Sequence, residues 1–208
     1  MYLPPQFAEP RAEELHRIVR EHPLGMLVTH TAAGLEANHL PFLLDAEQGL
    51  LVAHVARANP IWREVANGDA VLVVFRGAQG YISPNWYPSK HETHRRVPTW
   101  NYDVVHAHGS IHVHDDEKAV RGVVARLTRE HEAGQPRPWK MSDAPADYLA
   151  ETLAHIVALE VRVARLEGKR KLNQHHDARD REGVIQGLEA SGNAALAQAM
   201  RDTADPSG

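Results

Sequence analysis

The sequence predicts an α+β fold with a mainly β core, in which an antiparallel β-barrel carries peripheral helices. Three observations indicate it: at least six segments have strand length and composition, their connections are short, and helical segments flank them. The 208 residues suffice for one sizeable core, and no linker is strong enough to divide the chain into separate domains. We therefore expect one domain over residues 1–190, and a C-terminal helical extension with a flexible tail over 191–208.

The composition excludes several classes of protein. With 43% hydrophobic and 24% charged residues the chain is an ordinary globular sequence, and its net charge of −4 argues against a nucleic-acid binder. The absence of cysteine excludes disulfides, zinc–thiolate sites, iron–sulfur clusters and cysteine nucleophiles. No apolar run reaches membrane-spanning length, and the first residues lack the pattern of a signal peptide. We expect a cytoplasmic protein with no membrane partner.

The N-terminal part predicts one helix followed by three strands. The helix covers 10–21, where Pro10 suits the first turn and Leu15, Ile18 and Val19 form an apolar face. Strands follow at 24–31, 35–44 and 50–56, and Pro41 marks a kink or an edge in the second of them.

The middle of the chain predicts a short helix and two further strands. Asn59 and Pro60 are typical of a helix start, and Asn67-Gly68 ends that helix. A core strand covers 70–75, and residues 81–82 continue it after a turn that contains glycine. A long loop over 83–98 leads to a strand over 99–113, which Gly109-Ser110 could interrupt.

The C-terminal part alternates between helices and a strand. Asp115 is the expected cap of a helix that runs to 132, and residues 134–138 form a linker. A short helix covers 145–155, and alternating apolar and charged residues predict a half-exposed strand over 156–166. The segment 183–200 is helical with an interruption near Gly192.

Two segments carry side chains that suit a phosphate and a planar ring. His54, Arg57 and Asn59 lie where a strand gives way to a helix, so that an arginine fork and free backbone N–H groups face the same anion. The loop and strand start at 83–102 concentrate aromatic, hydroxyl, amide and lysine side chains that can stack on a ring or bond a phosphate. The alternatives are a solvated arginine beside an ordinary cap, and aromatics that plug a barrel or an interface.

Two further segments are rich in cations and in histidine. Residues 169–176, Lys-Arg-Lys-Leu-Asn-Gln-His-His, complete an anion site or form a solvated basic turn. His106, His108, His112 and His114 share one face of an unbroken strand and could bind a metal, although no pattern supplies a carboxylate. No catalytic acid or base is evident, and we assign no metal ligand.

In these segments the chain resembles the PaiB family of FMN-binding negative transcriptional regulators. The resemblance rests on Met1-Tyr2-Leu3-Pro4, on residues 54–60, 81–87 and 97–102, on Lys90, and on the stretch 167–172. It implies a split β-barrel of the FMN-binding type, related to pyridoxamine phosphate oxidase, which forms a homodimer with flavin sites between subunits. Asn173 and His175 depart from the family's usual Lys-Leu-Ser-Gln-Asn stretch.

Residues and resemblance together give the candidate FMN ligands. They are His54, Arg57, Asn59, Ser83, Trp86, Tyr87, Lys90, Thr99, Trp100, Asn101, Lys171 and Gln174. The function expected is that of a flavoprotein, either an FMN-dependent oxidoreductase or a flavin-linked regulator. The alternatives are a repressor that meets DNA through Arg95, Arg96 and residues 169–171, and a haem- or metal-binding barrel that uses the histidines.

Overall fold

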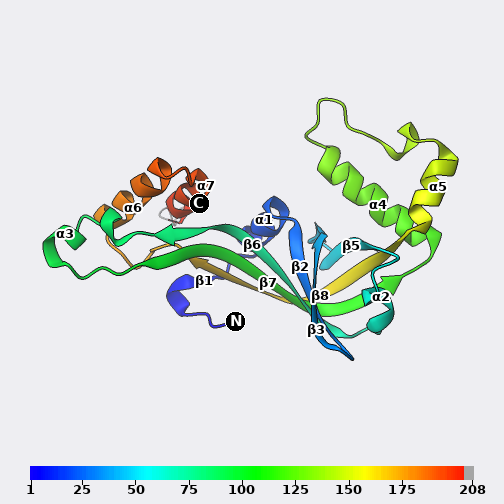
Figure 1. Cartoon of the computed structure of the whole chain (residues 1–208), viewed down its shortest axis with the longest axis horizontal. Helices are drawn as coiled ribbons and strands as arrows, with labels where there is room; N and C mark the ends of the chain where they lie inside the picture. Colours follow the sequence, from blue (N-terminus) through cyan, green and yellow to red (C-terminus); the bar gives the residue numbers. More distant parts are fainter. Residues whose placement is uncertain (204–208) are drawn as a thin grey trace. The chain divides into compact units, whose positions relative to one another are not determined.

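The computed structural model describes residues 1–203, which contain both a large antiparallel sheet and several helices. Contacts divide the chain into two compact units. Unit 1 contains Met1–Ile18, Arg76–Val105 and the chain from Glu167 onward; unit 2 contains Val19–Phe75 and His106–Leu166. Three long strands pass through both units (Figure 1), so each unit is built from segments that are distant in the sequence.

The strands form one sheet in the order β3-β2-β6-β7-β8-β5-β4, and β1 pairs with β8. Their bounds are β1 Ala8–Glu9, β2 Leu24–Thr31, β3 Gly34–Pro41, β4 Leu43–Asp45, β5 Leu50–Ala56, β6 Ala70–Ile82, β7 Thr99–His114 and β8 Ile156–Lys171. In unit 2, β2 pairs antiparallel with β3 and β6, and β5 pairs antiparallel with β4 and β8. This matches the predicted antiparallel β core.

The core of unit 2 comes from alternating residues of these strands. Leu27, Leu51 and Val73 are fully buried, and Leu27 lies opposite Val73 in the register. Gly25 allows close packing, since a Cβ there would lie 2.8 Å from side-chain atoms of Val73 and Phe75. The helices of this unit are α2 Ile61–Glu64, α4 Glu117–Glu132 and α5 Ala146–Ala154, with the short turn η3 Met141–Asp143.

In unit 1, helices pack against the C-terminal parts of β6 and β8 and the N-terminal part of β7. Its elements are η1 Pro5–Phe7, most of α1 Ala12–Glu21, η2 Pro84–Trp86, α3 Lys90–Thr93, α6 Ala178–Ala190 and α7 Ala194–Asp202. Helices α6 and α7 lie side by side (Figure 1), and a cluster that includes Ile82, Leu172, Leu188 and Leu196 is buried among them. Helix α7 is thus part of the packing of unit 1; residues 204–208 of the predicted tail lie outside the described residues.

The structure corrects several predicted boundaries. The predicted strand 35–44 is two strands, and the turn predicted between 75 and 81 is absent because β6 is continuous. Gly80 serves packing there, since a Cβ would lie 2.6 Å from the Asn193 side chain. Strand β7 does not break at Gly109, where a Cβ would lie 2.2 Å from the Arg162 carbonyl oxygen.

Two further corrections concern the start of α4 and the end of β8. The cap of α4 is Asp116, whose carboxylate accepts the Ala119 N–H at 2.9 Å, and not Asp115. Strand β8 continues through Lys171, so the basic residues predicted to follow the strand belong to it. The described helices include none that is long and apolar enough to cross a membrane.

Candidate functional site

A cavity of about 390 Å3 opens in unit 1. It is lined by Gln6, Phe7, Tyr87, Arg95, Arg96, Val97, Thr99, Lys171, Asn173, His175 and His176. Three of these residues, Arg95, Arg96 and Lys171, are cations, and none is a carboxylate. The cavity therefore suits a ligand with an anionic group, and its volume is typical of a small-molecule site.

Arg96 is held in place by a buried carboxylate. Asp180, near the start of α6, is fully buried and accepts hydrogen bonds from the Ser89 N–H at 3.0 Å, the Ser89 hydroxyl at 2.6 Å, and Arg96. Arg96 Nε also donates to Ser89 Oγ at 2.9 Å. Burial alone would raise the pKa of Asp180, but these hydrogen bonds hold it below its ordinary value. Asp180 is thus a permanent partner that fixes the direction of Arg96.

Lys171 reaches the same cavity from the end of β8. Its ammonium donates to Thr99 Oγ1 at 2.5 Å and to the Trp100 carbonyl oxygen at 2.8 Å. Burial lowers the pKa of Lys171, and Lys169 lowers it further, although Tyr102 opposes the change. No carboxylate is bonded to this ammonium among the described residues, so an incoming anion would be a favourable partner.

Aromatic and imidazole rings and the Asn173 amide form another part of the lining. The ring centroids of Phe7 and His175 are 5.4 Å apart, those of His175 and His176 are 4.1 Å apart, and those of His176 and Tyr87 are 5.2 Å apart. The Asn173 amide donates to the Tyr87 hydroxyl at 2.9 Å, while its buried Oδ1 has no partner in the described structure. A buried acceptor without a donor is costly, so a ligand that donates to it would be stabilised.

Three of the predicted site residues of unit 1 point into the protein instead. The Trp86 ring packs closely on α6 at Gly187, where an added Cβ would lie 2.4 Å from the ring. Asn101 is fully buried, and its amide lies 3.6 Å from the Met200 sulfur. Gln174 accepts the Leu172 N–H at 2.7 Å and donates to the Arg170 carbonyl oxygen. These contacts give each residue a structural role.

The remaining predicted residues of unit 1 lie outside the cavity lining. Ser83 caps η2 by accepting the Asn85 N–H at 3.2 Å, and Lys90 donates to the Asn85 side chain at 3.0 Å. The Trp100 side chain is 55% exposed. Of the nine candidates in this unit, the structure gathers Tyr87, Thr99 and Lys171 around the cavity.

The other three candidates belong to unit 2. His54 is half-buried on β5, its Nδ1 has no partner in the described structure, and burial lowers its pKa. Arg57 is already paired: it donates to Asp115 at 2.5 Å, to the Ala154 carbonyl oxygen at 2.6 Å and to the Ile156 carbonyl oxygen at 3.3 Å. These bonds compete with any phosphate.

Asn59 has both ends of its amide occupied. Its Oδ1 accepts the Ile61 N–H at 3.0 Å, and its Nδ2 donates to Asn38 at 2.7 Å. The N-cap of α2 is Pro60 and not Asn59, so the predicted helix start is one residue too early. The helix that follows, α2, has only four residues, so it adds little of the partial charge expected at a helix start.

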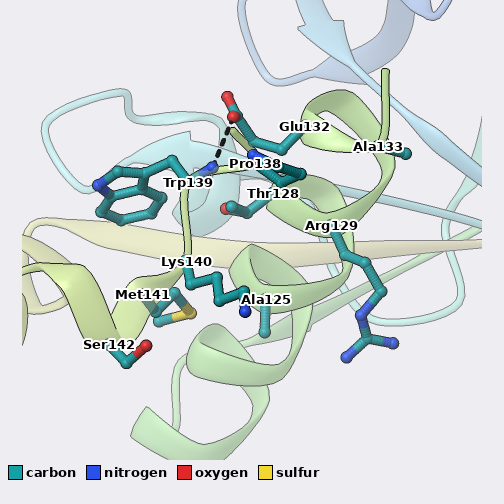
Figure 2. A pocket seen from close by; sticks show the side chains of 10 residues that line it. All are labelled: Ala125, Thr128, Arg129, Glu132, Ala133, Pro138, Trp139, Lys140, Met141 and Ser142. Atoms are coloured by element: carbon teal, nitrogen blue, oxygen red, sulfur yellow. Dashed lines mark hydrogen bonds between the residues drawn. The ribbon is translucent and has the colours of Figure 1, made fainter. Parts of the chain in front are cut away.

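Unit 2 has a second cavity of about 470 Å3, between α4 and the segment that follows it (Figure 2). The Glu132 carboxylate accepts the Trp139 N–H at 2.8 Å and ties that segment to α4. The walls are largely apolar, and Figure 2 shows the Lys140 side chain pointing toward α4 near Ala125. None of the twelve predicted site residues lines this cavity.

The basic cluster that would favour DNA binding is not formed at the surface. Arg170 is 2% exposed and lies 3.3 Å from carboxylate oxygens of Glu14 and Asp103. Lys169 is also buried, with its ammonium 5.4 Å from the ring centroids of Tyr2 and Tyr102. Both cations are therefore already satisfied inside unit 1.

The list of candidate ligands omitted most of the cavity lining, although residues 169–176 were considered as part of an anion site. Arg95, Arg96, His175 and His176 come together only because the loop before β7 and the segment after β8 meet in unit 1. In the sequence, the adjacent pairs Arg95-Arg96 and His175-His176 were the available signal for this cavity. The structure adds a signal that the sequence does not carry: Asn173 has a φ of 63°, and a non-glycine residue in the left-handed region often marks a constrained site.

Comparisons with known proteins agree with this architecture. Residues 1–165 match the family model described as "Putative FMN-binding domain". An uncharacterized protein of Aspergillus fumigatus is 33% identical over 240 residues, which cover 92% of each chain. The protease synthase and sporulation protein PAI 2 of Bacillus subtilis is 30% identical over 207 residues, which cover 97% of each chain.

Two solved structures share the fold at low sequence identity. The FAD and heme binding protein from Mycobacterium smegmatis gives a TM-score of 0.59 at 18% identity, over 86% of this chain and 80% of that one. The flavocytochrome Anf3 from Azotobacter vinelandii gives a TM-score of 0.57 at 12% identity, over 79% of this chain and 69% of that one. At such identities the likeness concerns the fold alone.

Proposed function

Because this chain belongs to the FMN-binding family of the PaiB type, we propose that it is an FMN-dependent oxidoreductase in which the cavity of unit 1 holds the cofactor's phosphate. The fold is the split β-barrel of flavin-binding proteins, with peripheral helices, and FMN is the cofactor of the family. The observation that carries the proposal is the convergence of Arg95, Arg96 and Lys171 in one cavity without a carboxylate.

The residues that line the cavity fit the chemistry of FMN. The three cations suit its phosphate, and Arg96 is the most rigid of them because Asp180 and Ser89 fix its guanidinium. The partnerless Asn173 Oδ1 suits a donor such as a ribityl hydroxyl or a ring N–H. The aromatic rings beside it offer apolar surface to a planar group.

The protein's part in the reaction would be binding and orientation. Bound FMN supplies the hydride or electron transfer, which belongs to the cofactor and not to a side chain. Arg96 and Lys171 fix the anionic end, while Tyr87 and Asn173 hold each other at 2.9 Å and so keep the lining rigid. We assign no side chain as acid or base.

We further propose that the protein works as a homodimer with flavin sites between subunits, as the family resemblance implies. The candidate ligands fall into two groups, with His54, Arg57 and Asn59 in unit 2 and the other nine in unit 1. A site shared between two chains would take one of these groups from each chain. In this arrangement Arg57 exchanges part of its pairing with Asp115 for the phosphate.

The test is a titration of FMN into the purified protein, followed by flavin fluorescence. Arg96→Ala should weaken FMN about tenfold to a hundredfold, since a charge-assisted hydrogen bond is worth about 1.5–3 kcal/mol. Arg121→Ala is a matched control, because Arg121 lies on the surface of α4 and pairs only with Glu117 among the described residues. Equal affinities of both variants and wild type would refute the assignment of the cavity.

Oxidoreductase activity needs a second measurement. The FMN-loaded protein should lose its flavin absorbance under anaerobic conditions when a reduced nicotinamide is added, and should recover it with an acceptor. If neither NADH nor NADPH reduces the bound flavin, although dithionite does, the protein is not a nicotinamide-linked oxidoreductase. That result would leave FMN binding intact.

A further inference from the structure

Two consecutive histidines after β8 form a stacked pair in the wall of the unit 1 cavity. The imidazole centroids of His175 and His176 are 4.1 Å apart, and both side chains line the cavity. Phe7 packs edge-on against His175 at 5.4 Å, and Tyr87 packs against His176 at 5.2 Å. The neighbouring rings therefore hold the imidazoles in place while they still border the cavity.

Burial and the nearby cations both favour the neutral form of the two imidazoles. Burial lowers the pKa of His175, and Lys171 and Arg96 lower it further. Burial also lowers the pKa of His176, together with His175 and Arg96, while Asp180 and Asp177 oppose that change from the start of α6.

The other groups that pack against the pair do not reverse this net lowering. Phe7 carries no charge, and burial raises the pKa of Tyr87, so that its hydroxyl stays protonated. Asp180 is already bound by Ser89 and Arg96. The cations therefore dominate the field that the imidazoles experience while the cavity holds no anion.

We propose that His175 and His176 are anion ligands of this cavity, which take up a proton from solvent when a phosphate ester or sulfate dianion enters. The dianion offsets the repulsion from Arg96 and Lys171, and an imidazolium donates a charge-assisted hydrogen bond to it. The identity of the natural anion as the FMN phosphate rests on the proposed function. The anion site itself rests on the three cations and the histidine pair.

This proton uptake gives the cavity a preference for dianions and a defined dependence on pH. The anion raises the pKa of the pair, so affinity grows as pH falls through the pKa of the bound state and levels off below that of the free state. A rise of about one pKa unit for one imidazole corresponds to about tenfold tighter binding at low pH. A carboxylate monoanion, with less charge to offset, should show a smaller effect.

The experiment uses sulfate, which stays a dianion between pH 5 and pH 8, so that any pH dependence belongs to the protein. Side-chain NMR follows the imidazole resonances over this range with and without saturating sulfate. His175→Gln and His176→Gln assign the resonances, since each variant loses one of them. We expect sulfate to raise the pKa of at least one of the pair by about one unit and to bind about tenfold more tightly at pH 5.5 than at pH 8.

His131 provides the matched control, because it is exposed on α4 in unit 2 and does not line the cavity. Its imidazole resonances should not respond to sulfate, and His131→Gln should bind sulfate as wild type does. The proposal is overturned if sulfate does not bind, if it binds without moving either pKa, or if the doubly substituted variant, H175Q with H176Q, keeps the same dependence on pH.

The outcomes also separate this inference from the proposed function. Sulfate that shifts the pair in a protein that fails to bind FMN would support the anion site and refute the flavin assignment. FMN that binds more tightly than riboflavin while the histidine pKa values stay fixed would support the flavin assignment and refute the role of the pair.

Discussion

Asp103 is a buried carboxyl group that lies beside the Arg170 guanidinium. It is 4% exposed and lies 3.3 Å from Arg170 Nε, within a group in which Arg170 also faces Glu9 and Glu14 at 3.7 and 3.3 Å. Burial raises the pKa of Asp103 to about 6, even though Arg170 opposes the change. The pKa of Glu9 is lowered against the effect of burial, chiefly by hydrogen bonds from Arg11, and the pKa of Glu14 is lowered chiefly by its hydrogen bond from Arg17. Arg170 adds a smaller effect in the same direction on both.

The raised pKa predicts how stability changes with pH. The folded chain holds this proton between pH 3.8, the ordinary pKa, and about 6, so stability falls as pH rises through that window. Asp103→Asn should remove up to about 3 kcal/mol of this dependence, since one pKa unit is about 1.4 kcal/mol. Urea unfolding at pH 4, 5, 6 and 7 measures it, with the exposed Glu117→Gln as control. If the free energy of unfolding of Asp103→Asn changes with pH as that of wild type does, Asp103 is not the source of this dependence.

Arg57 tests whether a residue paired within unit 2 also serves the cofactor. Arg57→Ala should weaken FMN by about tenfold or more and leave riboflavin unaffected, since riboflavin has no phosphate. Arg57→Lys should recover part of the loss, because an ammonium lacks the planar fork. Fluorescence titration of both flavins measures the effect. Equal losses for both would leave Arg57 as a structural partner of Asp115.

At the scale of elements, the central strand β6 carries the core of unit 2. Val73 is fully buried and lies opposite Leu27. Val73→Asp would bury a carboxylate without a partner and should abolish soluble expression. Tyr81→Asp, on an exposed position of the same strand, should express normally. Soluble Val73→Asp protein with the melting temperature of wild type would show that β6 is not a core strand.

How much the sequence predicts differs from element to element. The bounds of β2 and β5 match the sequence prediction, because apolar runs between turn residues define them locally. The glycines in β6 and β7 were interpreted as turns or breaks, yet Gly80 and Gly109 are needed where Asn193 and the Arg162 backbone approach. Such contacts between distant segments leave no local pattern.

At the candidate site, too, local patterns predict some features and contacts between distant segments decide the others. Lys171, Thr99 and Tyr87 were found because they stand in motifs, and all three line the cavity. Trp86 and Asn101 stand in motifs as well, but they pack inside unit 1. Residue type and spacing identify a functional segment, whereas only packing decides which side chain of that segment faces a ligand.

At the scale of the whole molecule, we predict a homodimer. Unit 1 exposes apolar side chains at Tyr2, Val97 and Trp100, which are 84%, 76% and 55% exposed. Sedimentation at micromolar concentration should show twice the chain mass of 23.1 kDa. Trp100→Glu should weaken the dimer, while Trp139→Glu in unit 2 should not. A species of the monomer mass alone would refute the prediction.

The central claim is that the cationic cavity of unit 1 recognises the phosphate of FMN, and one measurement tests it most directly. FMN and riboflavin are titrated into wild type and into Arg96→Ala at the same pH and salt concentration. The account predicts that wild type binds FMN at least about tenfold more tightly than riboflavin, and that Arg96→Ala loses most of this difference while its riboflavin affinity stays the same. Equal affinities for the two flavins in wild type, or an unchanged difference in Arg96→Ala, would contradict it.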